Sequence, residues 1–276
     1  MQHKILVTGA TGTVGRELIQ QLLEAGHHVR ALTRDPSRAH FPAGVEVVAG
    51  NLSTPATFAS ALEGVTGLHL INFDGATYAP LESGAEIIEL ARKAGVQRVS
   101  VLRGGQQGSI EESVQASNLC WTFLQPVEFM ANMLEWADSI RTEGTVSAPF
   151  GNRRTAIVHE ADIAAVAAAA LTQDGHAGKT YTITGPEVQT QPQMVRLIGK
   201  AIGRELAFVE LTEAEARAGW RAAGFSEEFI EFFVWAHGNT PEIGYTVVPT
   251  VELVTGRPAR TFAQWAQEHA GAFRTE

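Results

Sequence analysis

Cysteine is nearly absent from this chain, which has only Cys120 among its 276 residues. A single cysteine excludes an internal disulfide and a cysteine-ligated metal site, and the apolar run around it predicts a buried thiol. Long apolar runs are also missing, since the alanine-rich run 163–171 is too short to span a bilayer. The nine histidines show no metal-ligand spacing. We therefore expect no metal and no membrane contact.

Positive charge is scarce and spread along the chain. The sequence has 21 lysines and arginines against 30 aspartates and glutamates, with a net charge of −9 at pH 7. A nucleic-acid partner would require clustered basic residues, so we expect none. The first predicted strand starts at Lys4, which leaves no room for a secretory signal before it. The cytoplasm is the expected location.

Three glycines follow the first predicted strand at intervals of three residues. Residues 5–16 read ILVTGATGTVGR and lead into a helical pattern. A strand, a glycine-rich turn and a helix in this order can bind a diphosphate, because the helix N-terminus offers unpaired N–H groups and a positive dipole end. The alternative is a tight turn without a ligand. We predict nucleotide contacts at Gly9, Thr11, Gly12, Thr13, Val14 and Gly15.

Strand and helix patterns alternate through the first 126 residues. Strand-like runs lie at 4–8, 28–33, 45–49, 67–73, 98–102 and 120–125, and helical patterns lie at 14–25, 55–63, 81–94 and 110–118. Such alternation predicts βαβ units. We therefore expect an α/β fold of the Rossmann type, with a doubly wound parallel sheet, and assign 1–126 to an NAD(P)-binding core.

The pattern changes after Pro126. We predict a helix over 128–138, short strands within 144–158, an alanine-rich helix over 162–172 capped by Asp162, a strand over 179–183, and helices over 191–203, within 212–237 and over 261–272. Helix 162–172 and strand 179–183 are expected to pack on the core. The rest of 127–276 is expected to form a small, mixed and mostly helical substrate-binding lobe interleaved with the core.

The loop after the second predicted strand indicates the choice of coenzyme. The strand ends at Thr33 and Arg34, and Arg38 follows four residues later. An NAD site usually has an acidic residue here that binds the ribose 2′-hydroxyl, whereas arginine pairs with a 2′-phosphate. Asp35 precedes Pro36 and is expected to open a turn. We predict contacts from Thr33, Arg34 and Arg38 and a preference for NADP(H) over NAD(H). The alternative is that Arg34 is a solvated surface charge.

Residues after the third and fourth strands extend the predicted coenzyme site. Asn51 and Leu52 follow strand 45–49, where we expect the amide at the edge of the adenine ring and the leucine on its face. Asn72 and Phe73 end the run 67–73, beneath the expected nicotinamide ribose and ring. All four are predicted coenzyme contacts.

Seven segments of the chain together resemble a known family. They are VTGATGTVG at 7–15, TRDP at 33–36, GNL at 50–52, WTFLQP at 121–126, FMAN at 129–132, EADI at 160–163 and TGRPARTFAQW at 255–265. In this combination the chain resembles the atypical short-chain dehydrogenase/reductases, in particular the NmrA-like group that includes bacterial NAD(P)H:quinone and triphenylmethane-dye reductases. The resemblance covers nearly the whole chain and is much more specific for the fold than for the substrate.

Three positions depart from that group. Asn51 stands where the group usually has aspartate, Gln125 where it usually has arginine, and Arg103, before Gly104, where a serine commonly closes the fifth strand. The arginine lost at Gln125 and the arginine gained at Arg103 suggest a compensating swap in loops that line one cleft. Arg103 is therefore counted among the predicted coenzyme contacts.

The wider short-chain family uses a Tyr-x-x-x-Lys dyad for proton transfer, and this chain lacks it. No lysine lies four residues after any of its three tyrosines, so we do not expect alcohol oxidation or carbonyl reduction by that mechanism. Hydride transfer to a quinone, an azo bond or a cationic dye needs less, because the acceptor is itself electrophilic. Core packing is the alternative role of the aromatic residues that follow. The predicted substrate contacts are Gln106, Phe129, Met130, Asn132, Trp220 and Trp235.

The sequence thus predicts an NADPH-dependent reductase of quinone-like or other electrophilic aromatic compounds, with no catalytic residue identified. Two alternatives stay open. One is a non-catalytic NADP(H)-binding redox sensor or regulator, and the other is a specialised biosynthetic reductase or isomerase acting on a polycyclic intermediate. The expected partner is a small aromatic or quinone-like molecule, and a homo-oligomer is compatible with the sequence.

Overall fold

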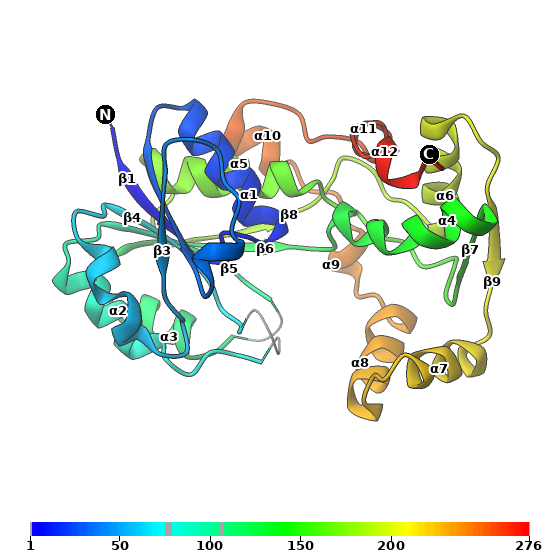
Figure 1. The fold of residues 1–276 in the computed structure, drawn as a ribbon, viewed down its shortest axis with the longest axis horizontal. Helices are drawn as coiled ribbons and strands as arrows, with labels where there is room; N and C mark the ends of the chain where they lie inside the picture. Colours follow the sequence, from blue (N-terminus) through cyan, green and yellow to red (C-terminus); the bar gives the residue numbers. More distant parts are fainter. Residues whose placement is uncertain (1, 75–78, 105–106, 276) are drawn as a thin grey trace. The chain divides into compact units, whose positions relative to one another are not determined.

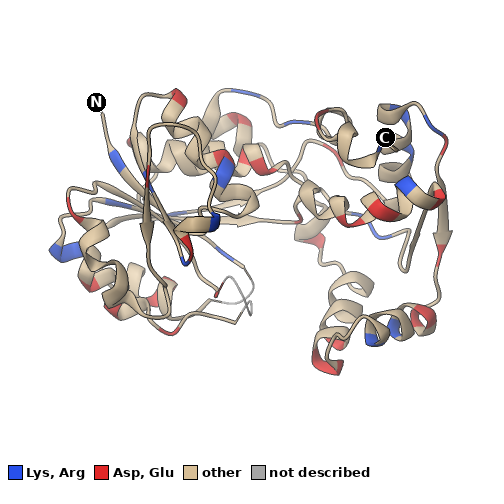
Figure 2. Cartoon of the chain, viewed as in Figure 1, with Lys and Arg blue, Asp and Glu red and all other residues tan. Residues whose placement is uncertain are grey.

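The computed structural model describes residues 2–74, 79–104 and 107–275, which form two compact units (Figure 1). Unit 1 contains Met1–Pro126, Glu160–Ile183 and Thr250–Arg257, and unit 2 contains Val127–His159, Thr184–Pro249 and Pro258–Glu276. Figure 2 shows basic and acidic residues interspersed along the elements of each unit. Within the described ranges, no helix has the length and apolar character needed to cross a membrane.

A parallel sheet of seven strands is the framework of unit 1. Its strand order is β3-β2-β1-β4-β5-β6-β8, and every neighbouring pair is parallel. This is the order of doubly wound dinucleotide-binding folds, so the predicted Rossmann-type α/β class is confirmed. The strands are β1 (Lys4–Val7), β2 (His28–Thr33), β3 (Val45–Ala49), β4 (Gly67–Ile71), β5 (Arg98–Leu102), β6 (Cys120–Pro126) and β8 (Lys179–Ile183).

Helices cover both faces of this sheet (Figure 1). On one face lie α1 (Thr13–Glu24), α5 (Glu160–Thr172) and α10 (Thr250–Thr255), and on the other lie the 3-10 helix η2 (Pro55–Leu62), α2 (Gly84–Lys93) and α3 (Ser109–Gln115). Alternate strand residues point to each face, and on the second face Leu70 and Val101 belong to one core with Phe58, Ile87 and Ile110. A short 3-10 helix, η1 (Pro36–Arg38), follows β2.

A histidine is buried within the sheet of unit 1. His69 of β4 is in register with Ser100 of β5, and its Nδ1 lies 2.8 Å from Ser100 Oγ. His69 is 1% exposed, and burial lowers its pKa to about 4. Since a charged imidazole would lose its hydration here, the folded chain holds His69 in the neutral form at neutral pH.

Two local predictions in unit 1 are wrong. Cys120 is exposed rather than buried, because it is the first residue of β6 and pairs with the first residue of β5, Arg98, at the amino-terminal edge of the sheet. The alanine-rich helix α5 begins at Glu160, so Asp162 lies inside its first turn and does not precede it as a cap. Asp162 is 2% exposed there.

Unit 2 is mostly helical and has a small parallel sheet. β7 (Thr145–Ala148) pairs with β9 (Ala207–Glu210). Short strands were predicted within 144–158, but residues 149–158, which follow β7, form turns and isolated bridges. Trp265 is fully buried in its core, together with Ile140, Ile198 and Phe273. The helices are η3 (Met130–Trp136), α4 (Ala137–Glu143), α6 (Gln191–Ile202), α7 (Glu213–Ala222), α8 (Glu227–Gly238), α9 (Glu242–Tyr245), α11 (Phe262–Glu268) and α12 (Ala270–Phe273).

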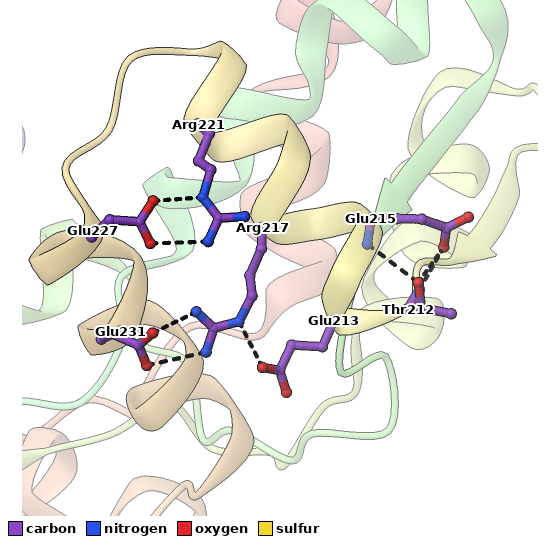
Figure 3. A network of polar contacts seen from close by, with 7 residues as sticks. All are labelled: Thr212, Glu213, Glu215, Arg217, Arg221, Glu227 and Glu231. Atoms are coloured by element: carbon purple, nitrogen blue, oxygen red, sulfur yellow. Dashed lines mark hydrogen bonds and ion pairs between the residues drawn. The ribbon is translucent and has the colours of Figure 1, made fainter.

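Ion pairs join α7 to α8 (Figure 3). Arg217 of α7 contacts Glu213 one turn earlier and Glu231 of α8, while Arg221 contacts Glu227 at the start of α8. Hydrogen bonds to the carboxylates of Glu231 and Glu213 raise the pKa of Arg217. These paired contacts fix the register of the two helices, which the sequence alone predicted only as two helical patterns.

The buried imidazole predicts a pH dependence of stability. The pKa of His69 is about 4 in the fold and 6.5 in the unfolded chain, so between these values only the unfolded chain gains a proton. The contribution of His69 to the free energy of unfolding is therefore complete above pH 6.5. We expect it to fall by roughly 3 kcal/mol as the pH drops from 6.5 to 4.

Denaturant unfolding of the wild type and of His69→Asn across this range measures the difference. The variant should show a shallower fall, while the exposed control His40→Asn should follow the wild type. Parallel curves for His69→Asn and the wild type would contradict the assignment.

Candidate functional site

The glycine turn of unit 1 connects the carboxyl end of β1 to α1. Gly9 has φ +59°, in the left-handed region that favours glycine, and its carbonyl accepts a hydrogen bond of 2.9 Å from the N–H of Gly12. A Cβ on Gly15 would lie 2.2 Å from the Gly9 carbonyl oxygen. Both ends of the glycine repeat are thus required by backbone geometry, because α1 leaves directly over the turn.

The first turn of α1 has backbone N–H groups without a side-chain cap. Gly12 occupies the N-cap position, no side chain there accepts a hydrogen bond, and the first turn carries no acidic residue. By contrast, Thr212, Ser226 and Thr261 cap α7, α8 and α11 with their hydroxyl groups. Uncapped amides and the positive end of the helix dipole suit an anionic ligand, so this turn fits the diphosphate of a dinucleotide.

The predicted contacts in this turn lie at its surface or beneath it. Thr11, Gly12 and Thr13 are exposed, whereas Val14 and Gly15 are buried. The Nε of Arg16 donates to the carbonyl oxygen of Thr11, which closes the turn from outside. The side chain of Val14 therefore faces the core, so any contact that Val14 or Gly15 makes with a ligand would come from the backbone.

In the loop after β2 two arginines are exposed to solvent, and the one carboxylate accepts hydrogen bonds from its own turn. The side chain of Arg34 is 52% exposed, and Arg38 is also exposed. Asp35 caps η1, where its Oδ1 accepts hydrogen bonds from the Ser37 N–H at 3.0 Å and the Ser37 hydroxyl at 2.6 Å. The hydrogen bond from the Ser37 side chain lowers the pKa of Asp35. Thr33 also takes part in this turn, since its Oγ1 accepts from the Asp35 N–H at 3.3 Å.

The turn after β3 holds the two residues predicted at the adenine ring. The Oδ1 of Asn51 accepts from the Ser53 N–H at 3.0 Å, which leaves the Nδ2 group of the amide for other partners. Leu52 is 8% exposed and belongs to the core of unit 1. The hydroxyl group of Ser53 donates a hydrogen bond to Asp74 Oδ2. The other oxygen of that carboxylate, Oδ1, lies 3.9 Å from a terminal nitrogen of Arg34.

The ends of β4 and β5 are tied together by Asn72. Its Nδ2 donates to Glu111 Oε1 at 2.7 Å and to the Gly104 carbonyl at 3.2 Å, and its Oδ1 accepts from the Gly104 N–H at 2.8 Å. Asn72 is 5% exposed, so its side chain builds the edge of the sheet rather than facing outward. Phe73 packs against Gly104, where an added Cβ would lie 3.1 Å from the ring.

Glu111 is the residue of this edge that the sequence prediction missed. Its carboxylate is fully buried, accepts from Asn72 and from the Gly108 N–H at 3.1 Å, and lies 3.3 Å from the Nε of Arg103. A signal was available: a glutamate at the third position of a helix commonly bonds the backbone N–H at the N-cap, and residues 108–111 read GSIE. Arg103, a predicted coenzyme contact, is thus anchored by this buried carboxylate.

The predicted substrate contacts of unit 2 have different surroundings. Met130 is 1% exposed and part of the core, and Trp220 packs against Phe233 with ring centroids 5.5 Å apart. Phe129 is half-buried, Asn132 is exposed, and Trp235 is 63% exposed. The remaining predicted contact, Gln106, lies outside the described residues.

Unit 2 contains a cluster of ionisable side chains that the sequence analysis did not predict. Arg153 pairs with both oxygens of Glu128, at 2.8 and 2.9 Å, and its side chain is only 9% exposed. Desolvation and the nearby Glu128 raise the pKa of Glu135, whereas burial and the Arg153 charge lower the pKa of His237. These four residues come from distant parts of the sequence, so no local motif identifies them.

Comparisons with known proteins agree with the nucleotide-binding geometry of unit 1. The profile of the NAD(P)H-binding family matches residues 9–174. The (4-alkanoyl-5-oxo-2,5-dihydrofuran-3-yl)methyl phosphate reductase of Streptomyces griseus is 39% identical, over 99% of this chain and 100% of its own length. The NAD(P)H azoreductase of Xenophilus azovorans is 34% identical, over 98% of this chain and 99% of its own length.

A solved structure extends the similarity to the fold. The NADPH-dependent quinone oxidoreductase of Escherichia coli, in complex with NADPH, has a TM-score of 0.78 and 25% sequence identity, and the similarity covers 96% of this chain and 99% of that one. These relatives are reductases that share the arrangement of the whole chain, as the sequence motifs predicted. The chain belongs to the NAD(P)H-binding family.

Proposed function

We propose that this chain is an NADPH-dependent reductase that delivers hydride to an electrophilic conjugated acceptor, such as a quinone-like or other aromatic compound. The uncapped N-terminus of α1, directly after the glycine turn, carries the proposal. Its amides would hold the coenzyme diphosphate, with contacts from Gly9 to Gly15 made mainly by the backbone. Bound in this way, the reduced nicotinamide would supply the hydride.

The loop after β2 supports a preference for NADPH. Arg34 is exposed, its guanidinium can bind a 2′-phosphate through two nitrogens, and Arg38 adds a second positive charge. The carboxylate of Asp35 accepts hydrogen bonds from Ser37 as the cap of η1, so Asp35 is engaged within its own turn and is not proposed as a ribose contact. Asn51 would contact the adenine edge through its Nδ2 group.

The relatives support the acceptor class. One is named for reducing a dihydrofuranone in which the ring double bond is conjugated with two carbonyl groups, and the other is named for reducing azo compounds. Both kinds of acceptor are conjugated, so we expect them to accept hydride without an acid that activates a carbonyl group. Such acceptors suit a chain without the Tyr-x-x-x-Lys dyad. The protein then raises the reaction rate mainly by positioning the coenzyme and the acceptor and by excluding side reactions.

Unit 2 is proposed to supply the contacts that select the acceptor. Phe129, Asn132 and Trp235 are partly or fully exposed, so their side chains are available to a planar ligand. Met130 and Trp220 would act indirectly, since Met130 belongs to the core of the unit and Trp220 packs on Phe233. Aromatic side chains bind flat conjugated molecules through offset stacking.

Coenzyme oxidation with a panel of acceptors tests the proposed reaction. A benzoquinone, an azo dye and an unsaturated lactone are mixed separately with protein and NADPH, and loss of the near-ultraviolet absorbance of NADPH is followed. We expect turnover with at least one acceptor and a tenfold or larger preference for NADPH over NADH. Coenzyme binding without any turnover would contradict the reductase proposal and favour the redox sensor.

Gly12→Asp separates coenzyme binding from folding. Aspartate is a good N-cap, which offsets the close approach of its Cβ to the Gly9 carbonyl oxygen at 3.1 Å, so the variant should fold with a stability close to that of the wild type. Its carboxylate would occupy the α1 amides and repel the diphosphate, so we expect the affinity for NADPH to fall by about 10²-fold. Calorimetry measures the affinity, and Gly12→Ala, which adds the same Cβ without a charge, is the control. Equal affinities of the two variants would argue against the α1 site.

Arg34→Glu tests the choice of coenzyme. Loss of a charge-assisted contact to the 2′-phosphate should weaken NADPH binding by about 10²-fold and leave NADH binding within a factor of about two. Arg92→Glu, at an arginine of similar exposure on α2, is the matched control and should change neither affinity. The same loss for both coenzymes in Arg34→Glu would remove the 2′-phosphate assignment.

A further inference from the structure

We propose that Arg103 is a catalytic residue, whose guanidinium binds the negative charge that develops on the acceptor, and that Glu111 is the positioning residue that holds Arg103 for this task. The inference rests on the proposed reductase function and assigns Arg103 to the acceptor instead of the coenzyme. The inference implies an acceptor with a conjugated system that ends in an oxygen or nitrogen atom, and this atom becomes anionic when the acceptor takes up hydride.

A fully buried carboxylate is the first support. Glu111 is 0% exposed, and burying an ionised group is costly unless charged or hydrogen-bonding partners replace its water. Asn72 and the Gly108 N–H donate to its two oxygens, and Arg103 supplies the positive charge. The carboxylate therefore joins the end of β4, the end of β5 and the start of α3 around one arginine.

The way in which Arg103 is held is the second support. It approaches Glu111 through Nε, and the guanidinium carbon lies 5.6 Å from the centroid of the buried Phe123 ring. Nε lies 3.3 Å from Glu111 Oε1 in an ion pair but makes no hydrogen bond, and in the part of the chain that the structure describes the ion pairs of Arg103 include neither terminal nitrogen. Arg153 differs, because its two terminal nitrogens make bidentate contact with the carboxylate of Glu128. The ion pair with Glu111 thus leaves the terminal nitrogens of Arg103 for another anion.

The place of Arg103 in the sheet is the third support. Dinucleotides bind across the carboxyl ends of the strands, with one mononucleotide half on each side of the point where the strand order reverses. In unit 1 that point lies between β1 and β4, and the glycine turn and Arg34 belong to the β1 and β2 side. Arg103 directly follows β5 on the other side, where the nicotinamide half would lie.

The chemistry needs a positive group at this position. Hydride transfer would break a C–H bond of the reduced nicotinamide and form a C–H bond on the acceptor, and the two transferred electrons would leave a negative charge on the conjugated oxygen or nitrogen of the acceptor. Arg103 would stabilise this charge through its terminal N–H groups. Water would then donate the proton.

Binding of 4-nitrophenol to the protein saturated with NADP⁺ tests the inference without turnover. Its phenolate mimics the anionic product, it ionises near neutral pH, and absorbance reports the ionised fraction. We expect the wild type to bind the phenolate at least tenfold more tightly than the phenol and to shift ionisation of the bound ligand to lower pH. Arg103→Met should lose both effects, and Glu111→Gln should weaken them.

Kinetics gives the second readout. Removal of a preorganised group that binds a developing anion typically lowers kcat by about 10²-fold, which we expect for Arg103→Met, with KM for NADPH within twofold of the wild type. Glu111→Gln should lower kcat by about tenfold, because the arginine remains but is no longer held by a charge. Glu112→Gln, at the adjacent exposed carboxylate of α3, is the matched control and should match the wild type in both assays.

Thermal unfolding shows whether each variant is folded, and calorimetry with NADP⁺ shows whether it still binds the coenzyme. Wild-type phenolate affinity and kcat in folded Arg103→Met would overturn the inference. So would a loss of NADP⁺ affinity as large as the loss of phenolate affinity, since Arg103 would then be a coenzyme residue. Failure of the wild type to oxidise NADPH with any acceptor would count against the proposed function, whereas the phenolate binding result would stand as its own test of Arg103.

Discussion

The contact between the Gly9 carbonyl and the residues above it is the constraint on which the nucleotide-binding geometry depends. This oxygen accepts from Gly12 and lies so close to Gly15 that a methyl group would not fit there. The turn is thereby tight enough to start α1 immediately after β1, at the edge where all strands of the sheet end. Because Gly12 brings no side chain, the helix amides stay available to an anion. One backbone oxygen thus connects the packing of α1 with the ability to bind a diphosphate.

A second constraint acts at the other side of the same edge. Glu111 is a buried negative charge that Asn72, Gly108 and Arg103 must satisfy together, so it fixes two strand ends and one helix start relative to each other. Reductases named for different acceptors are similar to this chain along nearly its whole length. A rigid frame of this kind explains how hydride chemistry could proceed without a tyrosine and lysine pair.

Unit 2 combines a firm core with an exposed aromatic hairpin. Trp265 and its neighbours are fully buried, whereas α8 exposes Phe232 and Trp235, at 55% and 63%. The hairpin of α7 and α8 is held by the ion pairs of Arg217 and Arg221 (Figure 3) and by the packing of Trp220 on Phe233. Polar contacts that position a helix leave its aromatic side chains free for a ligand, and this freedom supports acceptor selection by unit 2.

The sequence by itself determined the strands of the sheet, the glycine turn and the exposed arginine after β2, because hydrophobic periodicity, glycine spacing and turn residues act over a few positions. It did not determine the exposure of Cys120, which follows from the place of β6 in the sheet. Only the tertiary structure decided that Asn72 faces inward and that Glu111 lies against Arg103. A buried charge is stable only where partners from separate segments meet, and that meeting exists only once the chain has folded.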